Sequence, residues 1–220
     1  MGTTINMFKC RYQKRDTMNI SLQKIYDGFA QTYEKNRGLF DMTEVFNSFY
    51  ERLEPQKGNL LDLGCGVGEP FPRLFIDRGW KVTGVDFSGK MLALASKYVP
   101  EMKTIKADVL AVEFPPNQFD AITAIYSMFH IPSVDHSALF EKLYQWLGPQ
   151  GKALFTYATK EYTGQIEFDG YKEFMGQKLY YSHKSADKLY SDLIDIGFKI
   201  EAADYRDIGN EIFLWVTVSK

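Results

Sequence analysis

The spacing of apolar and polar residues divides the chain into an N-terminal helical part and a longer part in which strands and helices alternate. Apolar residues recur every three or four positions over 22–33, which predicts an amphipathic helix, and the same spacing over 42–53 predicts a second helix. Asp41, followed by Glu44, predicts a capping box at the start of this second helix.

From residue 59 onward, short apolar runs alternate with amphipathic segments. The predicted strands are 59–63, 81–85, 103–107, 119–126 and 152–157. The predicted helices between them are 70–78, 88–98 and 134–147, the last capped by Ser133 and ended by Gly148. Strands that are separated by helices are joined by right-handed crossovers, so this part predicts an open parallel sheet with helices on both faces.

The C-terminal part departs from this alternation. Glycines and alternating apolar residues over 158–184 predict a small hairpin insertion, with strands at 165–168 and 178–181. A helix is predicted over 185–196. It is followed by strands at 198–205 and 211–218, which must pair antiparallel because their connection is so short. The fold class expected is therefore α/β, doubly wound, with a mostly parallel sheet and an antiparallel C-terminal strand.

A glycine loop follows the first predicted strand. Gly64, Gly66 and Gly68 give the pattern G-x-G-x-G at the carboxyl end of that strand, where open α/β sheets bind their ligands. Glycines let a ligand approach the backbone closely, and the loop N–H groups point toward it. The dinucleotide-binding fingerprint requires a glycine one position later, where this chain has Glu69, and a carboxylate is unfavourable beside a pyrophosphate.

Acidic residues end the next two predicted strands. Asp86 follows Gly64 by 22 positions, a spacing that suits a carboxylate accepting hydrogen bonds from both hydroxyls of a ribose. Asp108 ends the third strand and is a suitable acceptor for an exocyclic amine such as that of adenine. Each feature also has a purely structural interpretation: a tight turn for the glycines, a helix cap for Asp86 and a turn for Asp108. Their coincidence at three successive strand ends favours a cofactor site.

These residues together resemble a known family. The sequence from Leu61 to Gly68, Gly84-Val85-Asp86-Phe87-Ser88, Ala107-Asp108 and Phe119-Asp120-Ala121-Ile122 is similar to the class I S-adenosylmethionine-dependent methyltransferases of small-molecule type. The resemblance covers about residues 20–220 in order. It implies a seven-stranded Rossmann-like sheet, an N-terminal helical lid over 20–54 and a single domain over 20–220. The residues before this domain lack periodicity, so 1–19 is expected to be a flexible leader.

The resemblance implies S-adenosyl-L-methionine as cofactor and assigns roles to particular residues. Asp62 and the loop Gly64–Gly68 are expected to hold the methionine end, Asp86 the ribose and Asp108 the adenine amine. The full set of expected cofactor-binding residues is Asp62, Gly64, Cys65, Gly66, Gly68, Asp86, Phe87, Met91, Asp108, Val109, Tyr126 and Ser127. Cys65 is interpreted as a spacer between two glycines and not as a nucleophile.

The substrate side is less defined. Tyr26 and Tyr33 resemble the tyrosine pair in the lid helix of small-molecule methyltransferases, and ordinary amphipathic packing explains them equally well. His130 follows the fourth strand and is the candidate general base, with local packing as the alternative. Phe129 and Tyr181 are the other expected substrate residues. His136 is expected to face outward, and His183 to close over the site.

Composition narrows the remaining choices. The 220 residues carry 26 basic and 28 acidic side chains, and this net charge of −2 gives no support for a nucleic-acid partner. Two cysteines and three histidines exclude a disulfide scaffold and predict no metal site. Because no signal peptide or membrane span is recognised, the expected location is cytoplasmic and the expected partner is a small-molecule substrate. The oligomeric state and the methyl acceptor stay undetermined.

Two other functions are compatible with the same pattern. An NAD-linked oxidoreductase would use a similar sheet, although Glu69 and the helices before the glycine loop count against it. A non-catalytic module that only binds S-adenosylmethionine would keep the whole cofactor set.

Overall fold

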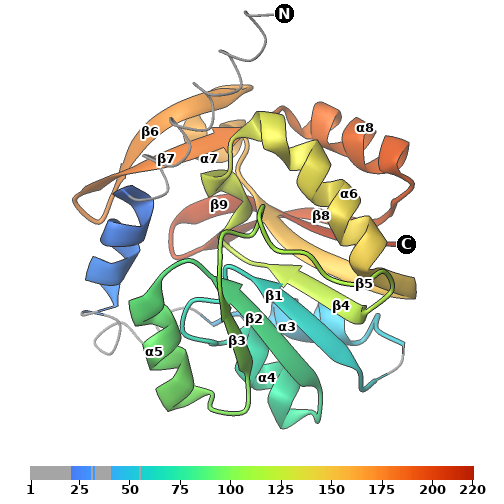
Figure 1. Ribbon diagram of the computed structural model, residues 1–220. Helices are drawn as coiled ribbons and strands as arrows, with labels where there is room; N and C mark the ends of the chain where they lie inside the picture. The colour runs from blue at the N-terminus through green and yellow to red at the C-terminus, as the bar shows by residue number, and fades with distance from the viewer. Residues whose placement is uncertain (1–20, 31, 33–40, 55) are drawn as a thin grey trace, which may run out of the picture.

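A seven-stranded sheet with the order β3-β2-β1-β4-β5-β9-β8 forms the centre of this computed structural model, which describes residues 21–30, 32, 41–54 and 56–220 (Figure 1). Its strands are β1 (Asn59–Leu63), β2 (Lys81–Asp86), β3 (Lys103–Lys106), β4 (Phe119–Ala124), β5 (Leu147–Tyr157), β8 (Lys199–Ile208) and β9 (Glu211–Ser219). Strand β9 pairs antiparallel with both β5 and β8, whereas β1 to β5 pair in parallel. The predicted fold class is confirmed, including its antiparallel C-terminal strand.

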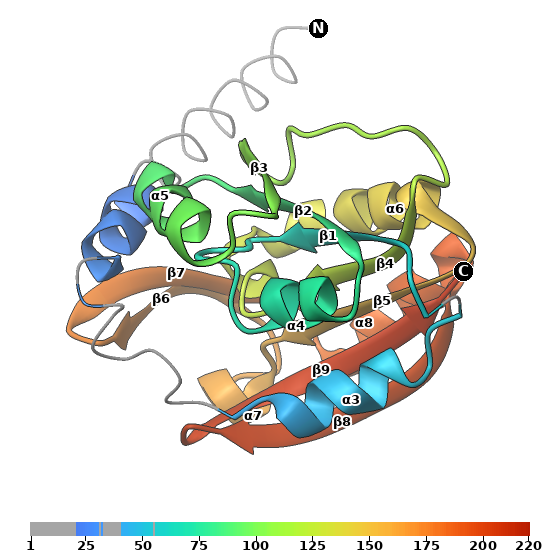
Figure 2. The ribbon, with the colours of Figure 1, turned by 90° about the horizontal axis from the view of Figure 1, so that it is seen from below.

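Helices cover both faces of the sheet. One face carries α3 (Thr43–Tyr50), α4 (Phe71–Asp77) and α5 (Gly89–Tyr98), and the other carries α6 (His136–Trp146) and α8 (Ala186–Ile196). Alternate strand residues serve the two cores: Leu60 belongs to the core under α3–α5, and its neighbour Leu61 belongs to the core under α6 and α8. Figure 2 shows α3 lying along β8 and β9, at the far side of the sheet from β3.

Helix ends follow the local sequence in most places. Ser88 caps α5 by accepting the N–H of Met91, and Ser185 caps α8 by accepting the N–H of Lys188. Gly197 ends α8 with a φ of +111°, a conformation that side chains rarely adopt. The predicted capping box at Asp41 is wrong, because its carboxylate accepts the N–H of Thr43 and the helix begins after Met42 without a side-chain cap.

Two predicted boundaries around α6 are also wrong. Ser133 does not cap the helix, since residues 133–135 form a 3-10 turn and α6 begins only at His136. The strand that follows begins at Leu147 instead of residue 152, because Leu147 already pairs with Phe119 of β4. Gly148, predicted to end the helix, therefore lies within the irregular start of β5.

A separate antiparallel hairpin stands above the carboxyl edge of the sheet (Figure 1). It consists of β6 (Phe168–Phe174) and β7 (Gln177–His183), and the short helix α7 (Lys160–Thr163) precedes it. The predicted hairpin is confirmed, but its first strand at 165–168 is misplaced. Residues 160–163 form α7, which ends at Gly164 with a φ of +78°, so the strand starts only after this turn.

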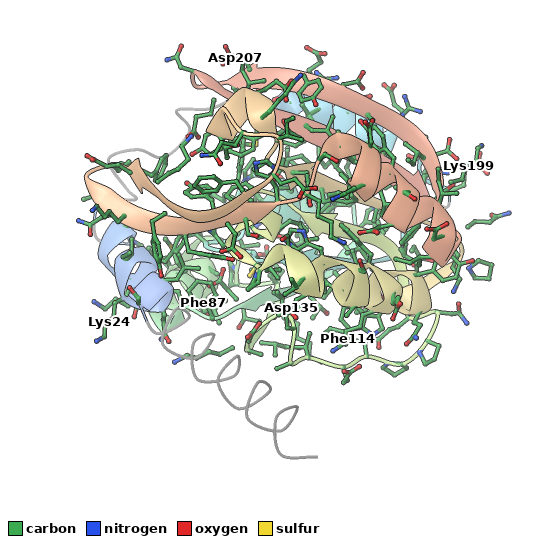
Figure 3. All side chains as sticks on the ribbon, turned by 90° about the horizontal axis from the view of Figure 1, so that it is seen from above. Lys24, Phe87, Phe114, Asp135, Lys199 and Asp207 are labelled. Carbon is green, nitrogen blue, oxygen red and sulfur yellow. The ribbon has the colours of Figure 1, made fainter. Side chains whose placement is uncertain are left out.

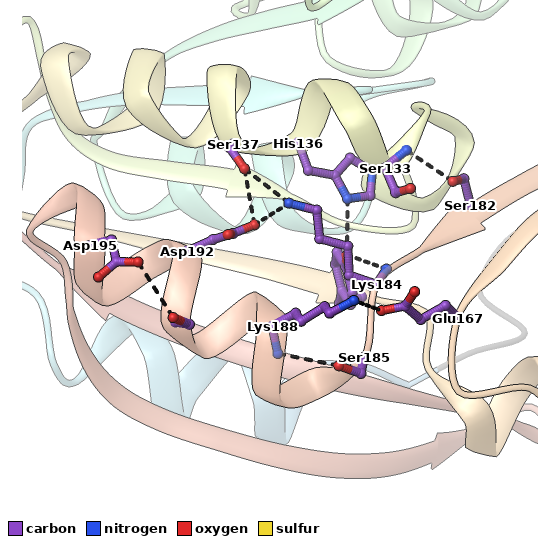
Figure 4. A network of polar contacts seen from close by, with 12 residues as sticks. Ser133, His136, Ser137, Glu167, Ser182, Lys184, Ser185, Lys188, Asp192 and Asp195 are labelled. Atoms are coloured by element: carbon purple, nitrogen blue, oxygen red, sulfur yellow. Dashed lines mark hydrogen bonds and ion pairs between the residues drawn. The ribbon is translucent and has the colours of Figure 1, made fainter.

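Buried polar side chains join α6, β5 and the end of β7 (Figure 4). His136 is fully buried; its Nδ1 lies 2.9 Å from the hydroxyl of Tyr157, and its Nε2 lies 2.8 Å from the carbonyl oxygen of Ile131. A carbonyl only accepts, so Nε2 carries the hydrogen and Nδ1 accepts from Tyr157. The Tyr157 oxygen also accepts the N–H of Lys184, whose ammonium pairs with Asp192 of α8.

The expectation that His136 faces outward is therefore wrong. Helical periodicity identified the apolar face of α6 but did not identify a histidine whose two ring nitrogens both have partners. Burial lowers the pKa of His136 to about 4, so the ring is neutral and can act as donor at one nitrogen and acceptor at the other.

We expect Tyr157→Phe to lower the free energy of unfolding by about 1–3 kcal/mol, because it leaves His136 Nδ1 and the Lys184 N–H buried without a partner. Chemical denaturation with both variants is the measurement. Tyr171→Phe is the matched control, since the Tyr171 side chain is exposed on the hairpin, and it should change stability by less than about 0.5 kcal/mol. Equal stability of Tyr157→Phe and the parent would contradict this account of the network.

Candidate active site

The glycine loop turns sharply between β1 and α4. Gly64, Gly66 and Gly68 have φ values of +76°, +52° and +79°, which side-chain-bearing residues rarely adopt. A Cβ at Gly64 would lie 2.4 Å from Cβ of Ser127, so the ends of β1 and β4 can approach only without a side chain there. A Cβ at Gly66 would meet nothing within 4 Å, so this part of the loop is open to a ligand.

Asp86 fixes the loop from the end of β2. One carboxylate oxygen accepts the N–H of Gly66 at 2.8 Å, and the other accepts the N–H of Ser88 at 2.7 Å. The alternative of a simple helix cap does not describe it, because Ser88 is the residue that caps α5. Burial raises the pKa of Asp86, and the two backbone hydrogen bonds act in the opposite direction.

Cys65 lies between the glycines and packs inward. A Cβ at Gly84 of β2 would lie 2.6 Å from Sγ of Cys65, so the thiol occupies the space that this glycine leaves. Burial raises the pKa of the thiol, and the charges of Asp62 and Asp86 raise it further. A protonated, buried thiol is a poor nucleophile, which agrees with the interpretation of Cys65 as a spacer.

Asp62 is a buried carboxylate beneath the loop. It pairs in register with Thr123 of β4, whose hydroxyl donates to it at 2.5 Å. Burial raises the pKa of Asp62 to about 7, and the charge of Asp86 contributes in the same direction. Burial disfavours the ionised form of Asp62, and a cationic group bound beside it would stabilise that form.

Asp108 and Val109 follow the edge strand β3. The Asp108 carboxylate accepts the N–H of Leu110 at 2.9 Å, so this residue does form the turn that the structural interpretation predicted. Asp108 comes two residues after Lys106, the last residue of β3, which is the edge strand of the sheet. Val109 is half-buried and packs against the core under α6.

Residues 21–29 form a helix that lies against α5 and the glycine loop (Figures 1 and 3). Its Ala30 end forms a small cluster with Val67 and Met91, against which Tyr26 and Phe29 pack. The Asp27 carboxylate accepts the hydroxyl of Ser88 at 2.5 Å. This helix is therefore attached to the residue that also bonds Asp86.

Tyr26 projects from helix 21–29 toward the end of β4. Its ring meets those of Phe87 and His130 edge-on, at centroid distances of 5.9 and 5.6 Å. Figure 3 shows Phe87 beside this helix, whose Lys24 points away from the protein. Tyr33 lies outside the described residues. The predicted second lid helix, α3, packs instead on α4 and the sheet face, where Phe46 contacts Phe75 at 5.2 Å.

His130 is held between helix 21–29 and the hairpin. Its Nδ1 lies 2.7 Å from the carbonyl oxygen of Tyr180, and its Nε2 lies 2.7 Å from the hydroxyl of Tyr26. The carbonyl can only accept, so Nδ1 carries the hydrogen and Nε2 accepts from Tyr26. Burial lowers the pKa of His130 to about 4, so the ring is neutral at physiological pH.

Tyr126 and Ser127 connect β4 to the short turn that carries Phe129 and His130. Tyr126 has a φ of +54°, and its N–H donates to the hydroxyl of Thr156 at 2.6 Å. The Ser127 hydroxyl donates to the carbonyl of Leu63 at 2.7 Å. Both bonds join the end of β4 to its neighbouring strands, so the backbone expected to line the sulfonium is fixed in place.

Stacked aromatic rings form a wall beside this turn. Phe129 stacks on Tyr181 at 5.3 Å and on Phe213 at 4.8 Å, and Tyr162 lies 4.4 Å from Phe213. The structure thus brings Tyr26, Phe129, His130 and Tyr181 together, as expected. His183 does not join them, because its Nε2 contacts the Thr163 hydroxyl at 2.7 Å and the ring is buried.

Sequence reasoning missed several residues at this edge. Thr123, Thr156 and Tyr180 each form a hydrogen bond with a candidate residue, Tyr180 through its backbone carbonyl, and Asp27 accepts the hydroxyl of Ser88, the cap of α5. No local motif marks such contacts, since each joins residues at least 30 positions apart in the chain.

Comparison with known proteins identifies the class. A family model described as "Methyltransferase domain" matches residues 36–203, which is more than half of the chain. The chain belongs to this methyltransferase domain family. The predicted resemblance to the S-adenosylmethionine-dependent methyltransferases is confirmed. Membership of this family argues against the alternative function, an NAD-linked oxidoreductase.

Individual relatives are similar in sequence to the chain over part of their length. Phosphoethanolamine N-methyltransferase of Plasmodium falciparum is 31% identical over 163 residues, which cover 71% of this chain and 59% of the relative. The 2-phytyl-1,4-naphtoquinone methyltransferase of Thermosynechococcus vestitus is 29% identical over 157 residues, covering 67% and 68%. The chain spans between 26% and 59% of the length of four curated relatives.

A solved structure shares the fold. The DhpI-SAM-HEP complex superposes with a TM-score of 0.68 at 20% identity, covering 91% of this chain and 97% of the other. This agreement confirms the architecture independently of sequence similarity.

We expect Asp62→Asn to stabilise the protein without cofactor at pH 8, by about 1–4 kcal/mol, and to change it little at pH 4. Because the pKa of Asp62 is raised to about 7 in the folded state, between about pH 4 and pH 7 the folded protein holds a proton on Asp62 that the unfolded chain has lost. The parent therefore loses stability as pH rises from about 4 to about 7, and the variant lacks this loss. Denaturation curves at both pH values test the prediction; parallel pH profiles of the two proteins would contradict it.

Proposed function

We propose that the protein transfers a methyl group from S-adenosyl-L-methionine to a small organic acceptor. The observation that carries this proposal is the arrangement of Asp62, Asp86 and Asp108 around an open glycine loop at three adjacent strand ends. Each carboxylate matches a different polar part of the cofactor, and the family membership supports the same reaction.

The residues present fit this cofactor. The open space at Gly66 suits a ligand that approaches the backbone, and Asp86 keeps lone pairs for ribose hydroxyls beside its two backbone bonds. Asp62 offers a buried countercharge to the ammonium of the methionine end. Asp108 is the candidate acceptor for the adenine amine, with Phe87, Met91 and Val109 as candidate apolar neighbours.

When bound, S-adenosylmethionine supplies an activated methyl group; the acceptor's lone pair forms the new bond to carbon as the S–CH₃ bond breaks. The protein's part is to align the acceptor and to exclude water. Where the acceptor carries a proton, the Tyr26 hydroxyl oxygen can take it while passing its own proton to Nε2 of His130. The Tyr180 carbonyl keeps His130 in the tautomer that this transfer requires.

Helix 21–29 is the proposed lid. Its contacts with Ser88 through Asp27 and with His130 through Tyr26 support a position over both the proposed cofactor edge and the proposed acceptor side. A helix attached at both points would order when the cofactor binds and would keep water from the sulfonium. The predicted leader at 1–19 lies outside the described residues, and the single domain over 20–220 remains part of this proposal.

The names of relatives support a broad class of acceptor, small organic molecules. The names of the two relatives above give acceptors as different as phosphoethanolamine and 2-phytyl-1,4-naphtoquinone, both small organic molecules. No helix among the described residues is long and apolar enough to cross a membrane. Within this proposal we retain a cytoplasmic location and no nucleic-acid partner. Turnover to S-adenosylhomocysteine separates the enzyme from a module that only binds the cofactor.

Asp86→Ala should weaken the binding of S-adenosylmethionine by about 1.5–3 kcal/mol, because hydrogen bonds to a charged acceptor are lost. Calorimetric titration of the purified protein is the measurement. Asp77→Ala is the matched control, since this carboxylate pairs with Arg73 on α4 and should leave the affinity unchanged. Unchanged affinity in Asp86→Ala would reject the ribose role.

His130→Ala should leave cofactor affinity unchanged and lower turnover by roughly 10²–10⁴-fold if the acceptor must lose a proton. Tyr26→Phe, which keeps the ring and removes the hydroxyl, should lower turnover in the same direction. Initial rates over a pH series and cofactor titrations together test the pair. Full rates for both variants across pH would leave alignment as the whole mechanism.

A further inference from the structure

The first residue of β9 brings a carboxylate to the acceptor side of the site. Leu214 of β9 pairs with Tyr157, the last residue of β5, so Glu211 lies three residues beyond the carboxyl end of β5. Because β9 runs antiparallel, its beginning shares the edge where β4 ends and where His130 follows. The Glu211 side chain is half-buried there.

Two tyrosines join Glu211 to His130. The Tyr162 hydroxyl lies 3.2 Å from Oε1 of Glu211 and 3.1 Å from the Tyr181 hydroxyl. The Tyr181 ring in turn lies 4.9 Å from the ring of His130. Tyr162 and Tyr181 supply two hydroxyl hydrogens, whereas both hydroxyl oxygens and the Glu211 carboxylate accept, so this surface offers more acceptor positions than donors.

The field of this surface is negative. Burial raises the pKa of Tyr126 and Tyr162, and the charge of Glu211 raises both further. Burial also raises the pKa of Tyr181 to about 12, again with a contribution from Glu211. The negative charge of Glu211 therefore raises the pKa of three tyrosines, Tyr126, Tyr162 and Tyr181, on the same side of the protein.

The ammonium of Lys172, the cation near Glu211, makes its contacts with Tyr162. Lys172 of β6 donates to the backbone carbonyl of Tyr162, and its ammonium lies 3.9 Å from the centroid of the Tyr162 ring. No ion pair joins Lys172 to Glu211, although both are described residues whose charges influence each other. Among the described residues, Glu211 is therefore left without an ion-pair partner, and its side chain contacts the hydroxyl of Tyr162.

We propose that Glu211, with the neighbouring hydroxyls of Tyr162 and Tyr181, selects an acceptor that carries an amine and binds it as its ammonium ion. A carboxylate in a partly desolvated position attracts an ammonium group, and the hydroxyl oxygens can accept further hydrogen bonds from it. An alcohol can donate one hydrogen bond there but lacks the charge attraction, and a carboxylate acceptor would be repelled. The inference rests on the proposed function, since it names the substrate class of that methyl transfer.

The proton balance is consistent with this assignment. The bound ammonium loses one proton to the Tyr26 hydroxyl oxygen, which passes its own to Nε2 of His130, and the nitrogen lone pair then attacks the methyl carbon. The acceptor nitrogen becomes methylated, and the cofactor leaves as the thioether S-adenosylhomocysteine. Glu211 takes no proton; it is a specificity residue that recognises the ammonium before the proton is lost.

The test uses the full-length protein with S-adenosylmethionine and two matched mixtures, one of small primary amines and one of the corresponding alcohols. We expect S-adenosylhomocysteine to form with the amines. For the amine consumed, Glu211→Gln should lower kcat/KM about 10–100-fold, mainly through KM, and leave the Kd of S-adenosylmethionine unchanged. Tyr162→Phe should raise the same KM by a smaller factor, which gives a second readout if Glu211→Gln folds poorly.

Asp207→Asn is the matched control, because it removes one exposed carboxylate from the same β8–β9 hairpin, at the outer margin of the protein (Figure 3). It should keep the parent KM. Formation of S-adenosylhomocysteine with alcohols alone, or an amine KM that Glu211→Gln leaves unchanged, would overturn the amine assignment while the methyltransferase stands. Failure to bind S-adenosylmethionine, with no acceptor consumed, would overturn both.

Discussion

The carboxylate of Asp86 accepts two backbone N–H groups, one from the glycine loop and one from the start of α5, and the shape of the cofactor edge depends on this sharing. The N–H of Gly66 fixes the loop after β1, and the N–H of Ser88 fixes the turn after β2. Ser88 then donates its hydroxyl to Asp27, so helix 21–29 is placed relative to the same carboxylate. A single buried charge thereby connects the loop, the sheet and the helix proposed as a lid.

The acceptor side depends on a second set of contacts, which come from the hairpin. The backbone carbonyl of Tyr180 orients His130, and the stacked rings of Phe129 and Tyr181 hold the turn that carries it. The hairpin inserted after β5 therefore positions His130 and Phe129. Its Tyr180 carbonyl binds the N–H at Nδ1 of His130 and so leaves Nε2 to accept from Tyr26, and its Tyr181 contacts Tyr162, which contacts Glu211.

The protein contains two buried tyrosine–histidine pairs with different surroundings. In both, a backbone carbonyl fixes one ring nitrogen and a tyrosine hydroxyl donates to the other. The Tyr157 oxygen in the pair with His136 also accepts the N–H of Lys184, and this pair lies among elements α6, β5 and β7. Tyr26 and His130 instead lie between two elements at the cofactor edge. The same pairing therefore joins core elements in one place, and in the other it is the pair through which we propose proton transfer.

The sequence alone determined the order of strands and helices, the glycine loop and the acidic strand ends, because these follow from periodicity, glycine spacing and position along single segments. It also placed Tyr26 and His130 among the candidates. Only the tertiary structure decided that they touch, that His136 is buried, and that Glu211 faces the same edge. Those facts depend on contacts between residues far apart in the chain, such as the 104 positions between Tyr26 and His130. Local spacing carries no record of them, since which side chains meet is set by how the sheet, helix 21–29 and the hairpin pack together.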